Sequence, residues 1–278
     1  MSNPQQEQED RELNERMGRI RHKILILSGK GGVGKSTFAA NLAVGLARAG
    51  HRTGILDVDL HGPSIPTLLG LAGSRLETDA RGRVQPIKRD DGLAVVSIGF
   101  LLENKADPVI WRGPLKYNAI RQFLRDVDWG ELDYLVVDSP PGTGDEPLSV
   151  AQLAGAGTRA VLVTTPQEVS VADVRRSISF CRMLELTVDG VVENMSGLEC
   201  PHCGKTIELF GSGGGERLAG EMGVPFLGRI PLDPGVVGSG DAGAPFARDP
   251  EQSPAGRAFA AIAERLAQRK EKEDPDPA

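Results

Sequence analysis

The stretch GKGGVGKS, from Gly29 to Ser36, is the most informative part of this chain about its architecture. It fits the phosphate-binding pattern G-x-x-x-x-G-K-[ST], which requires a strand before it and a helix after it. The apolar run KILILS (23–28) precedes it, and the helix-like run KSTFAANLAVGLARAG (35–50) follows it. Because both neighbours have the required character, a glycine-rich turn that matches by chance is the weaker interpretation. The stretch therefore predicts a P-loop that binds nucleotide phosphates.

The residues of this loop have distinct expected roles. The glycines let the backbone wrap around a phosphate, to which the N–H groups and the following helix N-terminus present positive dipole ends. Lys35 is expected to neutralise the β- and γ-phosphates of ATP, and Ser36 to ligate Mg²⁺. The predicted nucleotide contacts within the loop are Gly29, Lys30, Gly31, Gly32, Val33, Gly34, Lys35, Ser36 and Thr37.

Short apolar runs alternate with helix-like stretches along the rest of the chain. The runs are rich in β-branched residues and almost continuously apolar, which is typical of strands buried on both faces. This alternation indicates an α/β fold, a doubly wound and mostly parallel sheet with helices on both faces. The expected strands are 23–28, 53–59, 93–99, 134–140, 160–166, 189–195 and 225–231.

Polar segments flank the predicted core. Residues 1–22 and 271–278 contain too few apolar side chains to pack, so we expect a flexible polar N-terminal tail and a charged C-terminal tail. Between them, residues 23–270 are most simply interpreted as a single P-loop NTPase domain, with a C-x-x-C loop near 200–203.

The charge and hydropathy of the chain argue against nucleic-acid and membrane partners. The net charge of -6 gives no overall positive field, and no apolar run approaches the roughly 18 residues of a membrane span. The N-terminal residues lack the apolar core of a signal peptide, so we expect a cytoplasmic protein. The last helix-like run (255–270) places Phe259, Ile262 and Leu266 on one face, which we expect to pack on the domain.

Carboxylates follow two of the predicted strands. The run LVVDSPPGTGD ends a strand at Asp138, placed to hold Mg²⁺ through water, and continues into a Pro/Gly loop able to change shape with the γ-phosphate. The run ILDVD ends another strand at Asp57 and Asp59. Paired aspartates in such a place can also be turn formers or helix caps, but the nearby P-loop favours a nucleotide role.

Lys30 stands directly after the first glycine, where the basic P-loop pattern requires no lysine. The loop KGGVGKS thereby resembles the deviant Walker A group, which includes MinD, ParA, ArsA and nitrogenase iron protein. The resemblance implies that Lys30 reaches across a nucleotide-sandwich dimer to the partner's phosphate, although an exposed lysine here is equally a solvated charge. It also implies that Asp59 orients the attacking water, with Asp57 nearer to the Mg²⁺ shell. The expected catalytic residues are Lys30, Lys35 and Asp59.

The same resemblance assigns a role to Asn194. This residue ends the run GVVEN and matches the asparagine that reads adenine in the deviant Walker A group. An asparagine at the end of a strand is otherwise usually a turn residue. We therefore expect Asn194 to contact the nucleotide base.

The stretch ECPHCGK (199–205) contains two of the three cysteines, Cys200 and Cys203. Their spacing lets both thiols face one metal ion or cluster, but zinc or a cubane cluster takes about four ligands. Cys181 lies in a helix-like stretch, where a small buried residue is expected, and His202 is poorly placed between the thiols. In a twofold dimer the same loop from each subunit meets at the axis, and two pairs of thiolates make four. The spacing therefore favours a site shared by two subunits.

Other interpretations of this cysteine pair stay open. The string matches a thiol oxidoreductase site, although the surrounding sequence shows no thioredoxin-like βαβ unit. A structural Zn²⁺ across the dimer needs the same four thiolates, and spacing alone does not distinguish zinc from iron. An exposed pair without function is the third alternative.

Several motifs in a fixed order carry a more specific resemblance. SGKGGVGKST, DVDLHGPSIP, WRGPL, LDYLVVDSPPGTGDEPLS and ENMSGLECPHCG together resemble the Mrp/ApbC family of ATP-binding iron-sulfur cluster carriers, from about residue 18 to 265. The resemblance implies a homodimer that holds a labile [4Fe-4S] cluster on Cys200 and Cys203. It also implies a cluster donor, delivery to iron-sulfur apoproteins, and ATP binding or slow hydrolysis that changes the arrangement of the dimer. The four-cysteine N-terminal segment of the eukaryotic scaffold branch is not found here.

A positioning or partition ATPase of the ParA/MinD kind is the rival hypothesis. It predicts ATP-dependent binding to DNA or anionic lipid. The acidic charge, the weakly amphipathic last helix and the otherwise unexplained CPHC argue against it.

Overall fold

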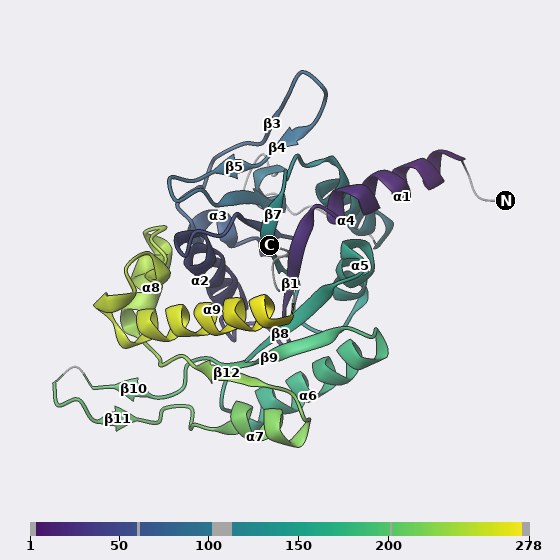
Figure 1. The fold of residues 1–278 in the computed structure, drawn as a ribbon. Helices are drawn as coiled ribbons and strands as arrows, with labels where there is room; N and C mark the ends of the chain where they lie inside the picture. Colours follow the sequence, from purple (N-terminus) through teal and green to yellow (C-terminus); the bar gives the residue numbers. More distant parts are fainter. Residues whose placement is uncertain (1–3, 60–61, 102–112, 201, 274–278) are drawn as a thin grey trace.

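A central sheet of eight strands organises the molecule (Figure 1). The computed structural model describes residues 4–59, 62–101, 113–200 and 202–273. The strand order is β12-β9-β8-β1-β7-β2-β6-β5, and within this sheet only β5 runs antiparallel to its neighbour. Helices cover both faces, so the predicted doubly wound, mostly parallel α/β fold is confirmed.

Every strand expected from the sequence is present. The sheet comprises β1 Ile20–Ser28, β2 Thr53–Asp57, β5 Ile87–Lys88, β6 Ala94–Ser97, β7 Leu132–Asp138, β8 Thr158–Thr164, β9 Thr187–Glu193 and β12 Phe226–Arg229. The sequence analysis missed β5 and two small ribbons outside the sheet, which pair β3 (Glu77–Thr78) with β4 (Val84–Gln85) and β10 (Leu198–Glu199) with β11 (Thr206–Ile207). Strands of two residues leave too short a pattern to detect.

The helices alternate with the strands as the sequence predicts. They are α1 Pro4–Met17, α2 Lys35–Arg48, α3 Ile65–Leu68, α4 Gly113–Asp126, α5 Asp145–Ala154, α6 Glu168–Met183, α7 Gly214–Glu221, α8 Pro234–Asp241 and α9 Pro254–Glu273. Short 3₁₀ helices are η1 Ile98–Leu101, η2 Phe246–Arg248 and η3 Pro250–Gln252. None of the helices within the described residues is long and apolar enough to cross a membrane.

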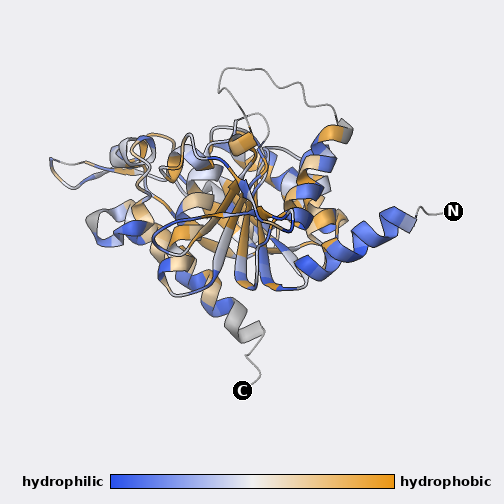
Figure 2. Ribbon diagram, turned by 90° about the horizontal axis from the view of Figure 1, so that it is seen from above, coloured by the Kyte–Doolittle hydropathy of each residue, from blue (hydrophilic) through white to orange (hydrophobic). Residues whose placement is uncertain are grey.

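The strands are buried on both faces because their side chains alternate between two cores. Leu25 and Leu27 of β1 belong to the core under α4, α5 and α6, whereas Ile24 and Ile26 belong to the core under α2 and α9. In Figure 2 many residues of the central strands have the orange of hydrophobic residues, whereas orange and blue residues mix along the helices around them. The period of two therefore explains the continuous apolar runs of the sequence.

The N-terminal segment differs from the expected flexible tail. Residues 4–17 form α1, whose Leu13 and Met17 are buried in the core beside α4. Arg121 of α4 forms ion pairs with Glu9 and Asp10 of α1. Two apolar side chains one helical turn apart are enough to pack an otherwise polar helix against the domain. The average composition of the segment does not reveal such a pair.

The C-terminal helix packs where the sequence places it. Phe259, Ile262 and Leu266 of α9 are buried in the core that α9 shares with α2, and the Phe259 ring stacks at a tilt on Phe38. The helix continues to Glu273, beyond the boundary expected for the tail, and residues 274–278 lie outside the described part of the chain.

Candidate nucleotide site and cysteine hairpin

The P-loop joins the end of β1 to the start of α2, in the middle of the sheet. Gly32 and Gly34 have φ angles of 79° and 84°, a left-handed conformation that side chains with a Cβ rarely adopt. A Cβ on Gly29 would lie 2.3 Å from the Cβ of Asp173 in α6, so this position admits only glycine. The backbone of the loop is thus free to wrap an anion at the N-terminus of α2.

The sheet brings the predicted carboxylates to the P-loop. Asp57 at the end of β2 lies in register with Asp138 at the end of the neighbouring β7. The Lys35 Nζ lies 2.5 Å from Asp138 Oδ1 and 3.7 Å from Asp59 Oδ2. The same Nζ donates a 3.3 Å hydrogen bond to the hydroxyl of Ser36. Loop and carboxylates therefore form one cluster.

Burial controls the charge of this cluster. Asp57 and Asp138 have no solvent exposure. Burial, with the nearby Asp138 carboxylate adding to it, raises the pKa of Asp57 to about 8. Burial also raises the pKa of Asp138, although Lys35 opposes the change. The cluster therefore favours a further positive charge.

Ser97 is a member of this cluster that the sequence analysis missed. Its hydroxyl donates a 2.9 Å hydrogen bond to Asp57 Oδ2, and the backbone N–H of Asp59 donates to Asp57 Oδ1 at 3.1 Å. Ser97 ends β6, which lies beside β2 in the sheet. Its position at the end of an apolar run was the available signal, because parallel strands end at one edge.

The residues present fit a magnesium ion. Within the described part of the chain, Asp138 Oδ2 is buried without a hydrogen-bond partner, so an acceptor is available next to the phosphate loop. Ser36, Asp57 and Asp138 supply the hydroxyl and carboxylate oxygens that Mg²⁺ prefers. Across the described residues no three His, Cys, Asp or Glu side chains are arranged to hold a metal alone. In P-loop sites Mg²⁺ takes its remaining ligands from phosphates and water.

A mainly apolar cavity of about 350 Å³ adjoins the P-loop. Gly34, Thr37 and Asn194 line one side, and residues 230–233 with α8 line another. Asn194 is buried, and its side chain donates a 2.9 Å hydrogen bond to the carbonyl of Val33. The structure thus brings Asn194 to the loop. The sequence analysis missed the wall at 230–233, because that segment lies on a distant strand end.

Lys30 lies at the edge of the loop with its side chain half-buried. Its carbonyl accepts a hydrogen bond from Ser28 Oγ, and its ammonium forms no ion pair within the described residues. The reach of Lys30 across a dimer stays a prediction.

Cys200 and Cys203 lie in the turn between β10 and β11, an arm that projects from the body of the molecule (Figure 1). The backbone N–H of Cys200 donates to Lys205, and that of Gly204 donates to Cys200, which closes the turn. Backbone N–H groups of His202 and Cys203 and the Cys203 thiol hold the pKa of Cys200 below its ordinary value. They favour the thiolate, which is the metal-binding form.

Cys181 is not part of this pair. It is buried in α6, and burial raises the pKa of its thiol to about 12. The prediction of a small buried apolar residue is confirmed.

Comparison with known proteins places this chain in a family. The sequence profile described as "ParA: NUBPL iron-transfer P-loop NTPase" matches residues 19–267. The chain belongs to this iron-transfer P-loop NTPase family. The family assignment agrees with the resemblance drawn from the motifs and with the observed fold.

Curated relatives of this iron-transfer NTPase match most of its length. The iron-sulfur cluster carrier protein of Methanocaldococcus jannaschii is 52% identical over 239 residues, covering 86% of this chain and 82% of the relative. The "cytosolic Fe-S cluster assembly factor NUBP2 homolog" of Monosiga brevicollis is 50% identical over 256 residues, covering 91% and 90%.

Solved structures show the same fold. A nucleotide-binding protein from Archaeoglobus fulgidus in complex with ADP is 42% identical, with a TM-score of 0.75 over 84% of this chain and 91% of that one. The cell division ATPase MinD of Pyrococcus furiosus, 24% identical, has a TM-score of 0.65 over 90% of this chain and all of that one. The second likeness concerns the fold alone.

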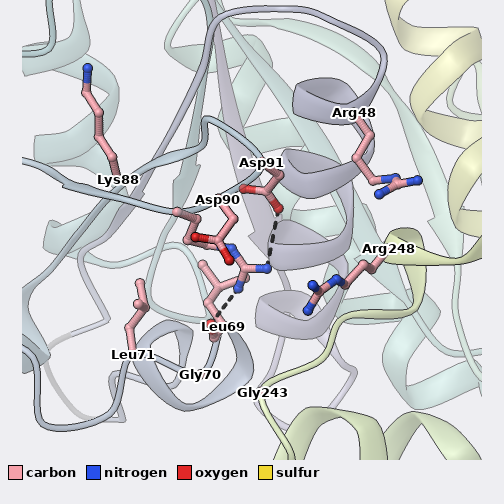
Figure 3. Close-up of a pocket in the computed structure, with 10 residues that line it drawn as sticks. Arg48, Leu69, Gly70, Leu71, Lys88, Asp90, Asp91, Gly243 and Arg248 are labelled. Atoms are coloured by element: carbon pink, nitrogen blue, oxygen red, sulfur yellow. Dashed lines mark hydrogen bonds and ion pairs between the residues drawn. The ribbon is translucent and has the colours of Figure 1, made fainter.

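A separate hollow of about 470 Å³ lies at the far end of α2 in this iron-transfer NTPase. Figure 3 shows Arg48 and Arg248 entering it from one side and Asp91 on the other. Asp91 forms an ion pair with Arg89. None of the predicted site residues lines this hollow.

Proposed function

We propose that this chain is an ATP-binding, slowly hydrolysing carrier of iron-sulfur clusters. It works as a homodimer in the cytoplasm, takes a labile [4Fe-4S] cluster from a donor, and transfers it to apoproteins. Relatives with about half of their residues identical are named iron-sulfur cluster carrier or cytosolic assembly factor. The observation that carries the proposal is the thiol pair, Cys200 half-buried and Cys203 exposed, on a projecting arm of an iron-transfer NTPase.

The dimer follows from the half-complete metal site. Cys200 and Cys203 have no third His, Cys, Asp or Glu in reach within the described residues. A second copy related by a twofold axis supplies the missing pair of thiolates. Ile207, Leu209 and Phe210 next to the thiols are also exposed, which supports a protein contact at this arm.

The nucleotide site supplies the driving reaction. Lys35 and the loop N–H groups hold the phosphates, and Asn194 contacts the base in the neighbouring cavity. Ser36, Asp57 and Asp138 hold Mg²⁺, which when bound offsets the phosphate charge, and Asp59 orients the attacking water. Residues 139–147 respond to the γ-phosphate; the N–H of Gly142 in this loop donates to Ser28 at the end of β1.

Cluster loading is the first test. Anaerobic reconstitution with iron and sulfide should give about four iron and four sulfide per dimer. The double variant Cys200→Ser, Cys203→Ser should lose them, whereas Cys181→Ala, which removes the buried thiol, should retain them. About one zinc per dimer without a stable cluster would make the pair a structural clip. Full cluster content in the double variant would defeat the proposal.

The trans role of Lys30 has its own test. Lys30→Ala should lower the rate constant for hydrolysis at saturating ATP by about 10-fold or more, because the developing phosphate charge loses a cation. The ATP dissociation constant of the monomer should change little. An unchanged rate constant would return Lys30 to the role of a solvated surface charge.

A further inference from the structure

Glu193 is a fully buried carboxylate that neither the nucleotide chemistry nor the thiols require. It ends β9, and its two oxygens accept three hydrogen bonds: from Ser196 Oγ at 2.6 Å, Gly213 N at 2.8 Å and Gly215 N at 2.6 Å. Arg229 Nε lies 3.4 Å from Oε1. Burying a carboxylate costs free energy unless its oxygens accept hydrogen bonds, as they do here. Moving one of these donors away from Glu193 would therefore be unfavourable.

These donors lie at the two ends of the cysteine arm. The cysteine arm comprises residues 197–212, which include β10 and β11. Ser196 immediately precedes this segment, and Gly213 immediately follows it, just before α7. A single oxygen, Oε1, accepts from both. Glu193 therefore fastens the entry and the exit of the segment that carries Cys200 and Cys203.

The same end of β9 borders the nucleotide cavity. Asn194, the next residue, donates to the P-loop carbonyl of Val33. Met195 then adopts a φ of 58°, uncommon for a residue with a Cβ, so the chain turns sharply between the cavity and the arm. The side chain of Asn194 thus contacts the P-loop, and that of its neighbour Glu193 contacts the two ends of the cysteine arm.

The backbone strengthens this connection. The N–H of Ile230 donates to the carbonyl of Glu193, and the N–H of Ser196 donates to the carbonyl of Ile230. The N–H of Leu232 donates to Gly197, at the base of the arm. Ile230 and Leu232 also line the nucleotide cavity, so one hydrogen-bonded unit forms a wall of the cavity and the base of the arm.

We propose that Glu193 is a positioning residue that couples nucleotide binding to the placement of the cysteine arm. A nucleotide that displaces Asn194 or the wall at 230–232 moves the end of β9, and Glu193 passes this movement to both ends of the arm. The inference rests on the proposed function, since the thiols matter as ligands of the transferred cluster. A purely structural role, as a cap of α7, predicts a loss of stability without any change in nucleotide response.

Alkylation of the thiols distinguishes these roles. The metal-free full-length protein is treated with iodoacetamide with and without Mg-ATP, and modification of each cysteine is followed by mass spectrometry. In the wild type, Mg-ATP should change the alkylation rate constants of Cys200 and Cys203 by about 5-fold or more, the usual lower range of coupling between sites. In Glu193→Gln, which keeps the size but removes the charge and one acceptor, the change should fall below about 2-fold.

Two further variants make the result decisive. Ser196→Ala removes one donor to Glu193 and should also weaken the response, even if Glu193→Gln does not fold. Ser212→Ala removes the exposed hydrogen bond from Ser212 to Glu208, outside this unit, and should respond as the wild type does. A wild-type response in Ser196→Ala and in any folded Glu193→Gln, or no response in the wild type, overturns the inference. Since the assay contains no iron or sulfide, a failure of cluster loading leaves its result unaffected.

Discussion

Asp57 and Asp138 form a buried pair of carboxylates for which Lys35 supplies a positive charge. Two negative charges out of contact with water oppose each other and favour protonation. A bound cation would remove the repulsion between the two carboxylates. The residues that lower the stability of the nucleotide-free protein are therefore the ones suited to bind Mg²⁺. The cost of this arrangement should be visible in the pH dependence of stability.

Asp57→Asn should reduce the loss of stability at high pH. The pKa of Asp57 is about 8 in the folded chain against an ordinary value of 3.8. The folded state binds this proton more tightly, so the free energy of unfolding falls as pH rises from about 4 towards 8 and then levels off. Between about pH 5 and 8 the fall should be smaller in the variant by about 1–4 kcal/mol, in urea titrations without nucleotide. Asp90→Asn, at an exposed site, should keep the wild-type fall; equal falls in all three proteins would contradict the prediction.

Gly34→Ala should destabilise the free protein and weaken nucleotide binding. Its Cβ would lie 2.2 Å from Asn194 Nδ2, at a φ of 84°. Moving Asn194 and straining the backbone should cost about 1–3 kcal/mol, measured as a lower unfolding midpoint without nucleotide. Gly31→Ala meets no atom within 4 Å and should unfold like the wild type. A wild-type midpoint for Gly34→Ala would show that Asn194 moves freely.

Among the elements, α1 shows how little apolar surface a peripheral helix needs. Most of this N-terminal helix is coloured as hydrophilic in Figure 2, whereas Leu13 and Met17 are buried in the core. Ion pairs from Arg121 flank this contact, but partly exposed pairs add little. The two apolar side chains should therefore contribute most of the binding of α1 to the domain.

Leu13→Ala should lower the free energy of unfolding by about 2 kcal/mol, because it removes buried methyl groups and leaves a cavity. Urea denaturation measures this change. Glu15→Ala, on the exposed side of the same helix, is the matched control and should remain within about 0.5 kcal/mol of the wild type. If both variants behave alike, α1 does not contribute to the stability of the domain.

At the scale of the whole molecule, the strand order makes the site. The neighbours β1, β7 and β2 place the P-loop, Asp138 and Asp57 together at one edge, and β9 brings Asn194 to the same edge. The cysteine arm leaves the sheet from the end of β9 as well. A conformational change at this edge is therefore close to both the nucleotide and the thiols.

Cluster and nucleotide should consequently affect each other equally. If the cluster changes the ATP dissociation constant by a given factor, ATP must change the affinity for the cluster by the same factor. We expect a factor of about 5 or more between metal-free and loaded protein, measured by equilibrium binding under anaerobic conditions. The Cys200→Ser, Cys203→Ser variant, treated identically, should keep the metal-free affinity. Equal affinities of the two wild-type forms would exclude thermodynamic coupling.

Local patterns were enough to predict the strands, the P-loop and the burial of Cys181. These features depend on neighbouring residues: continuous apolar runs, glycines at fixed spacing, and a cysteine within a helical stretch. Asp57 and Asp138 were also predicted, because each ends an apolar run in a chain that contains a P-loop, and because the motif of Asp57 resembles that of the deviant Walker A group. Their joint burial, which raises the pKa of Asp57, depended on the packing around them.

The remaining features came from contacts between segments far apart in the chain. Ser97 reaches Asp57 only because β6 lies beside β2, and the wall at 230–233 reaches the P-loop only because β12 follows β9 in the sheet. In the sequence, nothing distinguishes Glu193 from other residues at strand ends. Only in the fold do residues at both ends of the cysteine arm donate hydrogen bonds to it. Sequence periodicity indicates on which face of a helix or strand a residue lies. Strand order and burial arise only in the folded chain, and they determine which other residues that side chain contacts.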